Sequence, residues 1–299
     1  MGLLLHDGVE SAELGSGFCT SGDLATCRRI HRQYGTTYYF STLRLPKSVR
    51  WRTHALYAFV RIADEWVDNP GPLTVNERGE RLREWRNQLL KAIDGVPPTD
   101  PIMRAFADVL VQSRMPIEEP LLFLDSMEMD IKTDRYATFE DLRRYMRGSA
   151  AAVGVMMCYV LGAKPSESLF NSARALAEAM QLTNFLRDVG EDALRGRIYI
   201  PTEDLNAFEV RTSDIFDRQA TREFKEMMKF QIARARALYE IADDGIPLLP
   251  RESQRGVLLA RVLYSKILEK LEQQDYDPFA KRARTTKLEK LLAVASLSF

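Results

Sequence analysis

The sequence predicts an all-α protein, and three observations carry this prediction. Apolar residues recur at helical spacing along most of the 299 residues, strand-like alternation is scarce, and short turns containing Pro or Gly separate the helical segments. The clearest segment is 50–67, whose apolar stripe contains Ala55, Leu56, Phe59, Val60, Ile62 and Ala63. A Pro-Gly-Pro turn at 70–72 ends this helix, because Pro cannot continue it.

The remaining helices follow the same periodicity. They are expected near residues 77–93, 101–113, 118–130, 138–162, 166–193, 213–243 and 251–273. None of the connections between them is long or biased enough to be a domain linker. We therefore expect a single helical domain over 21–299, preceded by a flexible lead-in over 1–20 that contains Gly and Ser.

Composition and charge exclude several classes of function. The 42 basic and 42 acidic residues balance, which gives no basis for a nucleic-acid partner. Cys19, Cys27 and Cys158 lack metal-ligand spacing and are expected to be reduced thiols in a cytosolic protein. The three histidines form no HExxH or similar pattern, so no zinc site is predicted. A polyanionic ligand must therefore be recognised by a local arrangement of charges.

No targeting or membrane-spanning segment is expected. The longest stretch without a charged residue, 148–163, falls short of the roughly 20 residues that a spanning helix needs. The N-terminus has no basic residue before Arg28 and only a three-leucine run, unlike a signal peptide. We predict a cytoplasmic location.

The first motif with chemical meaning is RIADEWVD, residues 61–68. Asp64 and Asp68 are four residues apart, so both carboxylates project from one helix face, and Arg61 lies one turn earlier. An isolated pair of this kind is most often a solvated surface feature, but this pair directly follows an apolar stripe. Mg²⁺ favours one or two carboxylates together with substrate phosphates, so this face is a candidate metal site.

The second motif lies about 120 residues later, in QLTNFLRDVGEDALRGRIYIP at 181–201. Asn184, Asp188 and Asp192 are spaced i, i+4, i+8 and share one face, which alone could equally be a stripe facing water. Two such faces opposed across a cavity could bind Mg²⁺ ions bridged by a diphosphate, while Arg61 and Arg187 neutralise the remaining phosphate charge. This arrangement would remove diphosphate from an allylic carbon and leave a carbocation.

With these motifs the sequence resembles the squalene/phytoene synthase family, and its phytoene synthase branch most closely. The resemblance runs from about residue 27 to residue 291. Five stretches carry it: YGTTYYFSTLRLP (34–46), YAFVRIADEWVD (57–68), YMRGSAAAVG (145–154), NFLRDVGEDALRGRIYIP (184–201) and LYSKILEKLEQQDYDPF (263–279). It implies an isoprenoid-synthase-type helical bundle around a central cavity.

The resemblance also implies roles for individual residues. Mg²⁺ ligands would come from one side as Asp64 and Asp68, and from the other as Asn184, Asp188 and Asp192. The substrate-binding residues would be Arg61, Arg187, Tyr34 and Asn184, and the catalytic residues Tyr145, Tyr264, Asp64, Asp68 and Asp188. Tyr34 and the Asp-Glu form of the first motif are typical of plant and cyanobacterial phytoene synthases, whereas many bacterial relatives have histidine at the first position.

The sequence leaves two structural questions open. Tyr145 and Tyr264 could be core tyrosines with bonded hydroxyls, or phenols that stabilise a cation through the ring face or relay a proton. The small-residue run at 148–152 could leave space for a hydrocarbon tail or allow close helix packing.

The activity implied is the head-to-head (1–1′) condensation of two geranylgeranyl diphosphates, through a cyclopropyl diphosphate, to phytoene in carotenoid biosynthesis. The enzyme would be a prenyl transferase that uses Mg²⁺, with Mn²⁺ as a substitute, and needs no NADPH. The main alternative is a synthase that uses farnesyl diphosphate and forms dehydrosqualene, squalene or hydroxysqualene.

Readings from other classes are less favoured. A non-catalytic relative should have lost a metal-facing residue, yet all five are present, and a terpene cyclase or chain elongase would lack the YMRGSAAAVG and RGRIYIP stretches. Because the product would be an insoluble hydrocarbon, peripheral association with a membrane is a further hypothesis, although no strong amphipathic anchor is evident in the sequence. Oligomeric state cannot be read from it.

Overall fold

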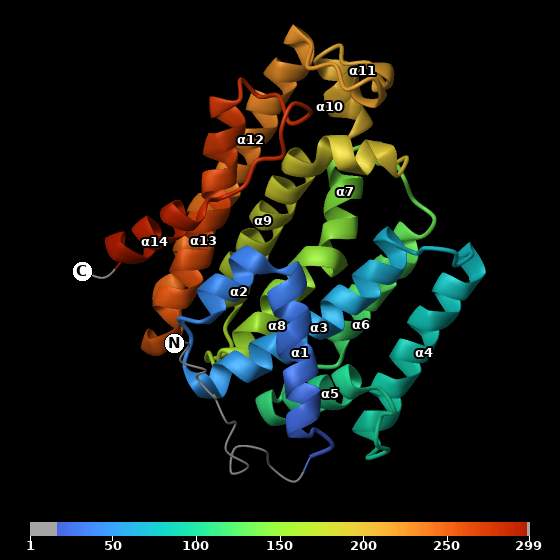
Figure 1. The fold of residues 1–299 in the computed structure, drawn as a ribbon, viewed down its shortest axis with the longest axis vertical. Coiled ribbons are helices and arrows are strands. Elements are labelled where there is room, and N and C mark those ends of the chain that lie inside the picture. The colour runs from blue at the N-terminus through green and yellow to red at the C-terminus, as the bar shows by residue number, and fades with distance from the viewer. Residues whose placement is uncertain (1–16, 298–299) are drawn as a thin grey trace, which may run out of the picture.

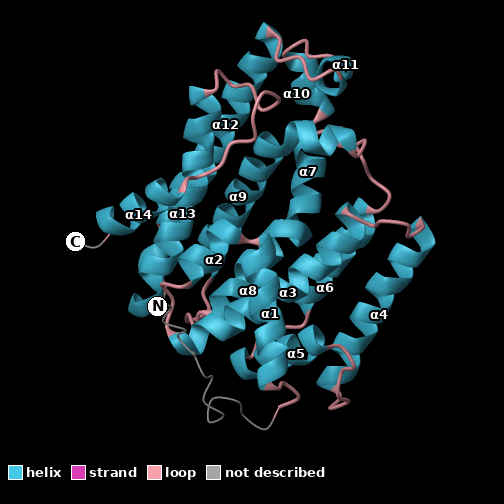
Figure 2. Cartoon of the chain, viewed as in Figure 1, coloured by secondary structure: helices cyan, strands magenta, loops and turns pink. Residues whose placement is uncertain are grey.

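The computed structural model describes residues 17–297, and this part of the chain consists of helices joined by loops, without a β-strand (Figure 2). One isolated bridge joins Arg135 to Ile198. The predicted all-α class is therefore confirmed. Most of the lead-in expected at 1–20 lies outside the described residues. Within them, α1 begins at Ser21, where Thr20 forms a capping box with Asp23.

The elements follow one another along the chain as Figure 1 labels them. They are α1 (Ser21–Tyr34), α2 (Thr36–Thr42), α3 (Lys47–Asp68), α4 (Val75–Ile93), α5 (Pro101–Ser113), α6 (Glu118–Asp130), α7 (Phe139–Met146), the π-helix η1 (Arg147–Ala152), α8 (Val153–Val160), α9 (Glu167–Leu194), α10 (Thr202–Ala207), α11 (Thr212–Phe216), α12 (Arg222–Asp243), the 3₁₀ turn η2 (Ile246–Leu248), α13 (Arg251–Gln273) and α14 (Lys287–Ser296).

Periodicity predicted one continuous helix where the structure has two. The segment 213–243 was expected to be continuous, but α11 ends at Phe216 and α12 begins at Arg222. Arg218 adopts a left-handed backbone with φ 56°, which no helix tolerates, and Thr221 then accepts a hydrogen bond from the backbone of Phe224 to start α12. Periodicity also overlooked the four helices α1, α2, α10 and α14.

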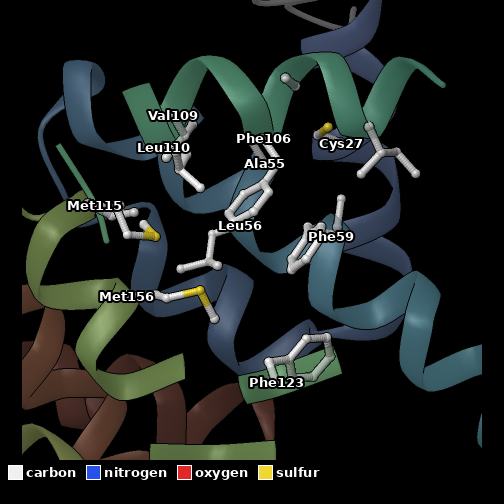
Figure 3. Packing of buried hydrophobic residues seen from close by; sticks show 14 of the residues in the cluster. Cys27, Ala55, Leu56, Phe59, Phe106, Val109, Leu110, Met115, Phe123 and Met156 are labelled. Carbon is white, nitrogen blue, oxygen red and sulfur yellow. The ribbon is translucent and has the colours of Figure 1, made fainter. Parts of the chain in front are cut away.

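Two large hydrophobic clusters hold the helices together. The first joins α1, α3, α4, α5, α6 and α8, and Figure 3 shows Phe59 of α3 beside Phe106 of α5, with ring centroids 3.9 Å apart. The second joins α7 and α9 to α12 and α13. Each fully buried large side chain contributes roughly 1.5–3 kcal/mol, so the first cluster holds α3 in place and the second holds α9.

The long helix α9 lies among α7, α8, η1, α12 and α13 (Figure 1). Two glycines allow close approach next to it. A Cβ on Gly154 would lie 2.5 Å from the carbonyl oxygen of Ala173 in α9, and one on Gly148 would lie 2.3 Å from that of Leu122 in α6. Ser149 and Ala150, between them, line a cavity. The small-residue run therefore allows close packing at Gly148 and borders a cavity at Ser149 and Ala150, whereas its role in holding a hydrocarbon tail stays a prediction.

Candidate active site

A polar cavity of about 640 Å³ lies between α3, α9, the α1–α2 joint, α13 and the segment that precedes α14. Its wall includes every site residue expected from the sequence: Tyr34, Arg61, Asp64, Asp68, Tyr145, Asn184, Arg187, Asp188, Asp192 and Tyr264. These residues come from positions as far apart as 34 and 264 in the chain. The fold thus brings the two acidic motifs to one cavity.

An apolar cavity of about 280 Å³ adjoins the polar one. The residues that line both are Tyr57, Val60, Ser149, Gln181, Asn184 and Tyr264. The deeper wall of the apolar cavity consists of side chains such as Leu45, Leu56, Met157 and Leu169. A ligand that occupied both would have one charged end and one hydrocarbon end.

On the α3 face of the polar cavity, Asp64 and Glu65 share one arginine, Arg61. The Arg61 guanidinium lies 2.5 Å from the Asp64 carboxylate, pairs with Glu65, and sits 4.8 Å from the Tyr34 ring centroid. Burial, and then the negative charge of Asp68, raise the pKa of Asp64 to about 7 despite Arg61. This carboxyl is held in a place where a second cation would stabilise its charge.

The α9 face holds three oxygen-bearing side chains that differ in their charge environment and hydrogen bonding. Arg187 and Arg282 both donate to the Asp188 carboxylate, at 2.5–2.9 Å, and these bonds lower its pKa although burial opposes them. Burial, followed by the charges of Asp188 and Asp68, raises the pKa of Asp192 to about 8. The Oδ1 of Asn184 is buried and accepts no hydrogen bond.

Two arginines outside the predicted set connect the faces. Arg197 bonds to Asp68 and lies 3.3 Å from the Asp130 carboxylate, while Arg195 contacts Asp192 and Asn69, each at 3.3 Å. The C-terminal ends of α3 and α9 are therefore tied together.

Sequence reasoning assigned no role to several residues in or beside this cavity, among them Asp130, Arg195, Arg197, Tyr199 and Arg282. The Tyr199 hydroxyl donates to Asp130, 3.2 Å away, and burial raises the pKa of Asp130 to about 6 even though Arg197 opposes it. Arg197 and Tyr199 fall within the 184–201 stretch and could have been found there. Asp130 and Arg282 belong to no motif, and only the fold brings each of them to the polar cavity.

The two tyrosines differ in their surroundings. Tyr145 is buried among other phenol rings, with Tyr136 and Tyr199 centroids at 5.4 and 5.9 Å. Tyr264 lies where the two cavities meet. Burial raises the pKa of both hydroxyls, so both are neutral near pH 7.

The oxygen donors of this cavity fit Mg²⁺. Asp64 and Asp192 have raised pKa values, which means that the protein alone does not fully compensate their charge, and the Asn184 Oδ1 lacks a donor. Across residues 17–297, no three His, Cys, Asp or Glu side chains are grouped to hold a metal ion by themselves. In proteins Mg²⁺ usually takes one or two carboxylates and completes its shell with water and substrate phosphate oxygens.

Comparison with known proteins gives the class of protein. The sequence model of the family "Squalene/phytoene synthase" matches residues 31–289, and the chain belongs to this family. It is 36% identical over 273 residues to phytoene synthase 3, chloroplastic, of Zea mays, covering 90% of this chain and 63% of the maize protein. The chain thus spans less than two thirds of that relative. It is also 36% identical over 280 residues to the phytoene synthase of Arthrospira platensis, covering 90% of each.

The fold agrees with this assignment. A crystal structure of a dehydrosqualene synthase in complex with ligand superposes with a TM-score of 0.86 at 29% identity, covering 92% of this chain and 95% of the other. The expected isoprenoid-synthase-type helical bundle around a central cavity is therefore confirmed. Among the helices of residues 17–297, none combines the length and the apolar character needed to cross a bilayer.

Proposed function

We propose that the protein is a prenyl transferase that condenses two geranylgeranyl diphosphates head to head to form phytoene. The observation that carries this proposal is the meeting of two oxygen-bearing helix faces over one polar cavity that adjoins an apolar one. Identities of 36% to phytoene synthases of Zea mays and Arthrospira platensis support the choice of product. Tyr34 and the Asp-Glu motif point the same way.

In this proposal, Asp64 and Asp68 on α3 and Asn184, Asp188 and Asp192 on α9 hold Mg²⁺, for which Mn²⁺ can substitute. The metal would supply positive charge that stabilises the departing diphosphate. Arg61 and Arg187 bind the phosphate oxygens, and Arg282 is placed to join them because it already bonds to Asp188. The apolar cavity holds a prenyl tail and excludes water from the cation.

The reaction has two parts. One donor loses diphosphate, the double bond of the second attacks the resulting C1 cation, and loss of a proton gives a cyclopropyl diphosphate. This intermediate loses its diphosphate, rearranges to the 1–1′ linkage and loses a second proton, which creates the central double bond. Tyr264, at the junction of the cavities, and Tyr145, on the wall beside Asp130, are proposed to stabilise the cations through their ring faces.

A second candidate uses the fifteen-carbon donor, farnesyl diphosphate. The superposition on a dehydrosqualene synthase supports this candidate. The same metal faces would serve either donor, so they do not decide between them. We prefer the longer donor because the phytoene synthases cited above share more sequence with this chain than that synthase does.

The proposal also covers the reductant, the domain organisation and the location of the protein. No NADPH is required, because forming phytoene is not a reduction. We further propose a single domain over 21–299 and a cytoplasmic protein that associates peripherally with membranes, where its long-chain substrates and product reside.

The experiment is product analysis by mass spectrometry after incubation with Mg²⁺ and either donor, with and without NADPH. A C40 hydrocarbon from geranylgeranyl diphosphate without NADPH is the expected result. A C30 product from farnesyl diphosphate alone would replace the proposal by its alternative. Wild-type turnover by D64N or D188N would remove the assigned site, with D125N, which changes an exposed acid of α6, as the matched control.

A further inference from the structure

The C-terminal helix α14 presents an apolar face on the outside of the molecule. Leu288, Leu291 and Leu292 expose 65%, 59% and 59% of their surface, unlike nearly all other leucines in the described part of the chain. Their spacing of three and four residues places them on one side of the helix, together with the exposed Ala295. The opposite side packs on α13 through the buried Ala293.

This helix is held firmly in place despite its exposed face. Thr286 and Glu289 form a capping box at its N-terminus, and Glu289 pairs with Lys270 of α13 at 2.7 Å. Figure 1 shows α14 at the edge of the bundle, beside α13. The leucines are therefore displayed by an ordered helix and do not belong to a frayed end.

The charge around α14 differs from that of the whole chain. The chain has no net charge, yet residues 281–290 contain five basic side chains and one acidic side chain. Lys281, Arg284 and Lys287 are exposed, and Glu289 is already paired. An exposed leucine face bordered by lysine and arginine matches an interface that is apolar inside and negatively charged at its surface, as an anionic bilayer is.

The segment that leads into α14 also forms part of the wall of the polar cavity. Ala283, Arg284 and Thr285 line it, as does Lys290 within α14. Thr285 lies within 3.4 Å of Thr37, hydroxyl to hydroxyl. A surface that receives α14 would therefore lie next to one wall of the polar cavity.

We infer that the Leu288–Leu291–Leu292 face of α14 docks the protein on the surface of an anionic lipid bilayer, next to the wall of the polar cavity. This inference rests on the proposed function, which supplies the reason for a prenyl lipid to move between bilayer and cavity. The sequence pattern did not reveal this helix, because an apolar stripe over the 10 residues 287–296 is too short to be recognised by periodicity. At 10 residues, α14 is about 15 Å long and lies in the interface without crossing it.

Vesicle co-sedimentation of the full-length protein tests the inference without any turnover. The vesicles are phosphatidylcholine alone or phosphatidylcholine mixed with phosphatidylglycerol. Wild-type protein should bind the anionic vesicles more tightly, and L288S/L291S/L292S should lose about tenfold or more in affinity. V75S/V96S/V111S is the matched control, because it removes three apolar side chains that are also exposed, far from α14, and it should bind as wild type does.

Additional measurements separate docking from other roles of this face. With substrate supplied in detergent, the α14 variant should turn over at the wild-type rate, because none of its three leucines lines either cavity. Wild-type protein that stays in the supernatant with both vesicle types would overturn the inference. So would a variant that sediments as wild type does, or one that converts a wild-type dimer to monomer with vesicle affinity unchanged.

Discussion

The two acidic faces of the cavity look alike in sequence and differ in charge balance. On α3, the pKa of Asp64 is raised to about 7, because burial and Asp68 outweigh its single arginine. On α9, Asp188 has two arginines and a lowered pKa, whereas Asp192, one turn later, has a pKa raised to about 8. Equal i, i+4 spacing therefore conceals one carboxylate whose charge the protein stabilises and two whose charge it disfavours.

The largest expected effect is on turnover, where the two faces should behave alike. D64N and D188N should each lower kcat by at least about a hundredfold, because each removes a proposed ligand of the Mg²⁺ that would stabilise the departing diphosphate. Steady-state assays with the C20 donor measure this, with D125N as the control. A variant on either face that keeps more than half of wild-type kcat would show that only one face acts.

The second effect separates the faces by stability. D188N leaves Arg187 and Arg282 without their shared carboxylate and should destabilise the metal-free protein by about 2 kcal/mol. D64N should be neutral or stabilising, because the raised pKa of Asp64 indicates that the metal-free fold disfavours its charged form. Urea unfolding without Mg²⁺ gives both values. Equal destabilisation by the two variants would contradict the difference in charge balance.

The third effect is a pH dependence. An aspartate whose folded pKa exceeds its usual 3.8 costs nothing below about pH 4 and destabilises the fold increasingly as pH rises through the folded pKa. Asp64 and Asp192 should therefore lower the stability of metal-free protein between about pH 4 and 8. Thermal unfolding should show a larger rise in Tm on adding Mg²⁺ at pH 8 than at pH 6. An equal rise at both values would count against this account.

The smallest effect concerns the link between the faces. R195Q removes contacts of 3.3 Å to Asp192 and Asn69, and these partly exposed groups should contribute no more than about 0.5 kcal/mol. Urea unfolding should therefore be nearly unchanged. R197Q, which breaks buried bonds to Asp68 and Asp130, should destabilise the protein clearly more, and the reverse order would show that Arg195 is the main tie.

The sequence predicted the helices that bear the motifs and the residues that the fold brings together, because spacing on one helix is a local property. Asp64 and Asp68 follow from the period of α3, and Asn184, Asp188 and Asp192 from that of α9. The role of each remains a proposal. Periodicity failed at Arg218, where one left-handed residue splits a helix, and at α14, where a short helix has its apolar side outward.

Contacts between distant segments could not be predicted from the sequence. Arg282 reaches Asp188 across 94 positions, and Arg197 reaches Asp68 across 129. These contacts set the charge balance of each face, which no local pattern contains. The same holds for Asp130, whose carboxylate meets Tyr199 only after α6 and the loop that follows α9 have packed together.

The central claim is that both faces act on one diphosphate through shared Mg²⁺. Calorimetric titration of the purified protein with inorganic diphosphate, with and without Mg²⁺, tests it most directly. The account predicts tight binding by wild type only with Mg²⁺, and loss of that Mg²⁺-dependent binding in both D64N and D188N. Wild-type affinity in either variant, or equal affinity in the absence of Mg²⁺, would contradict it.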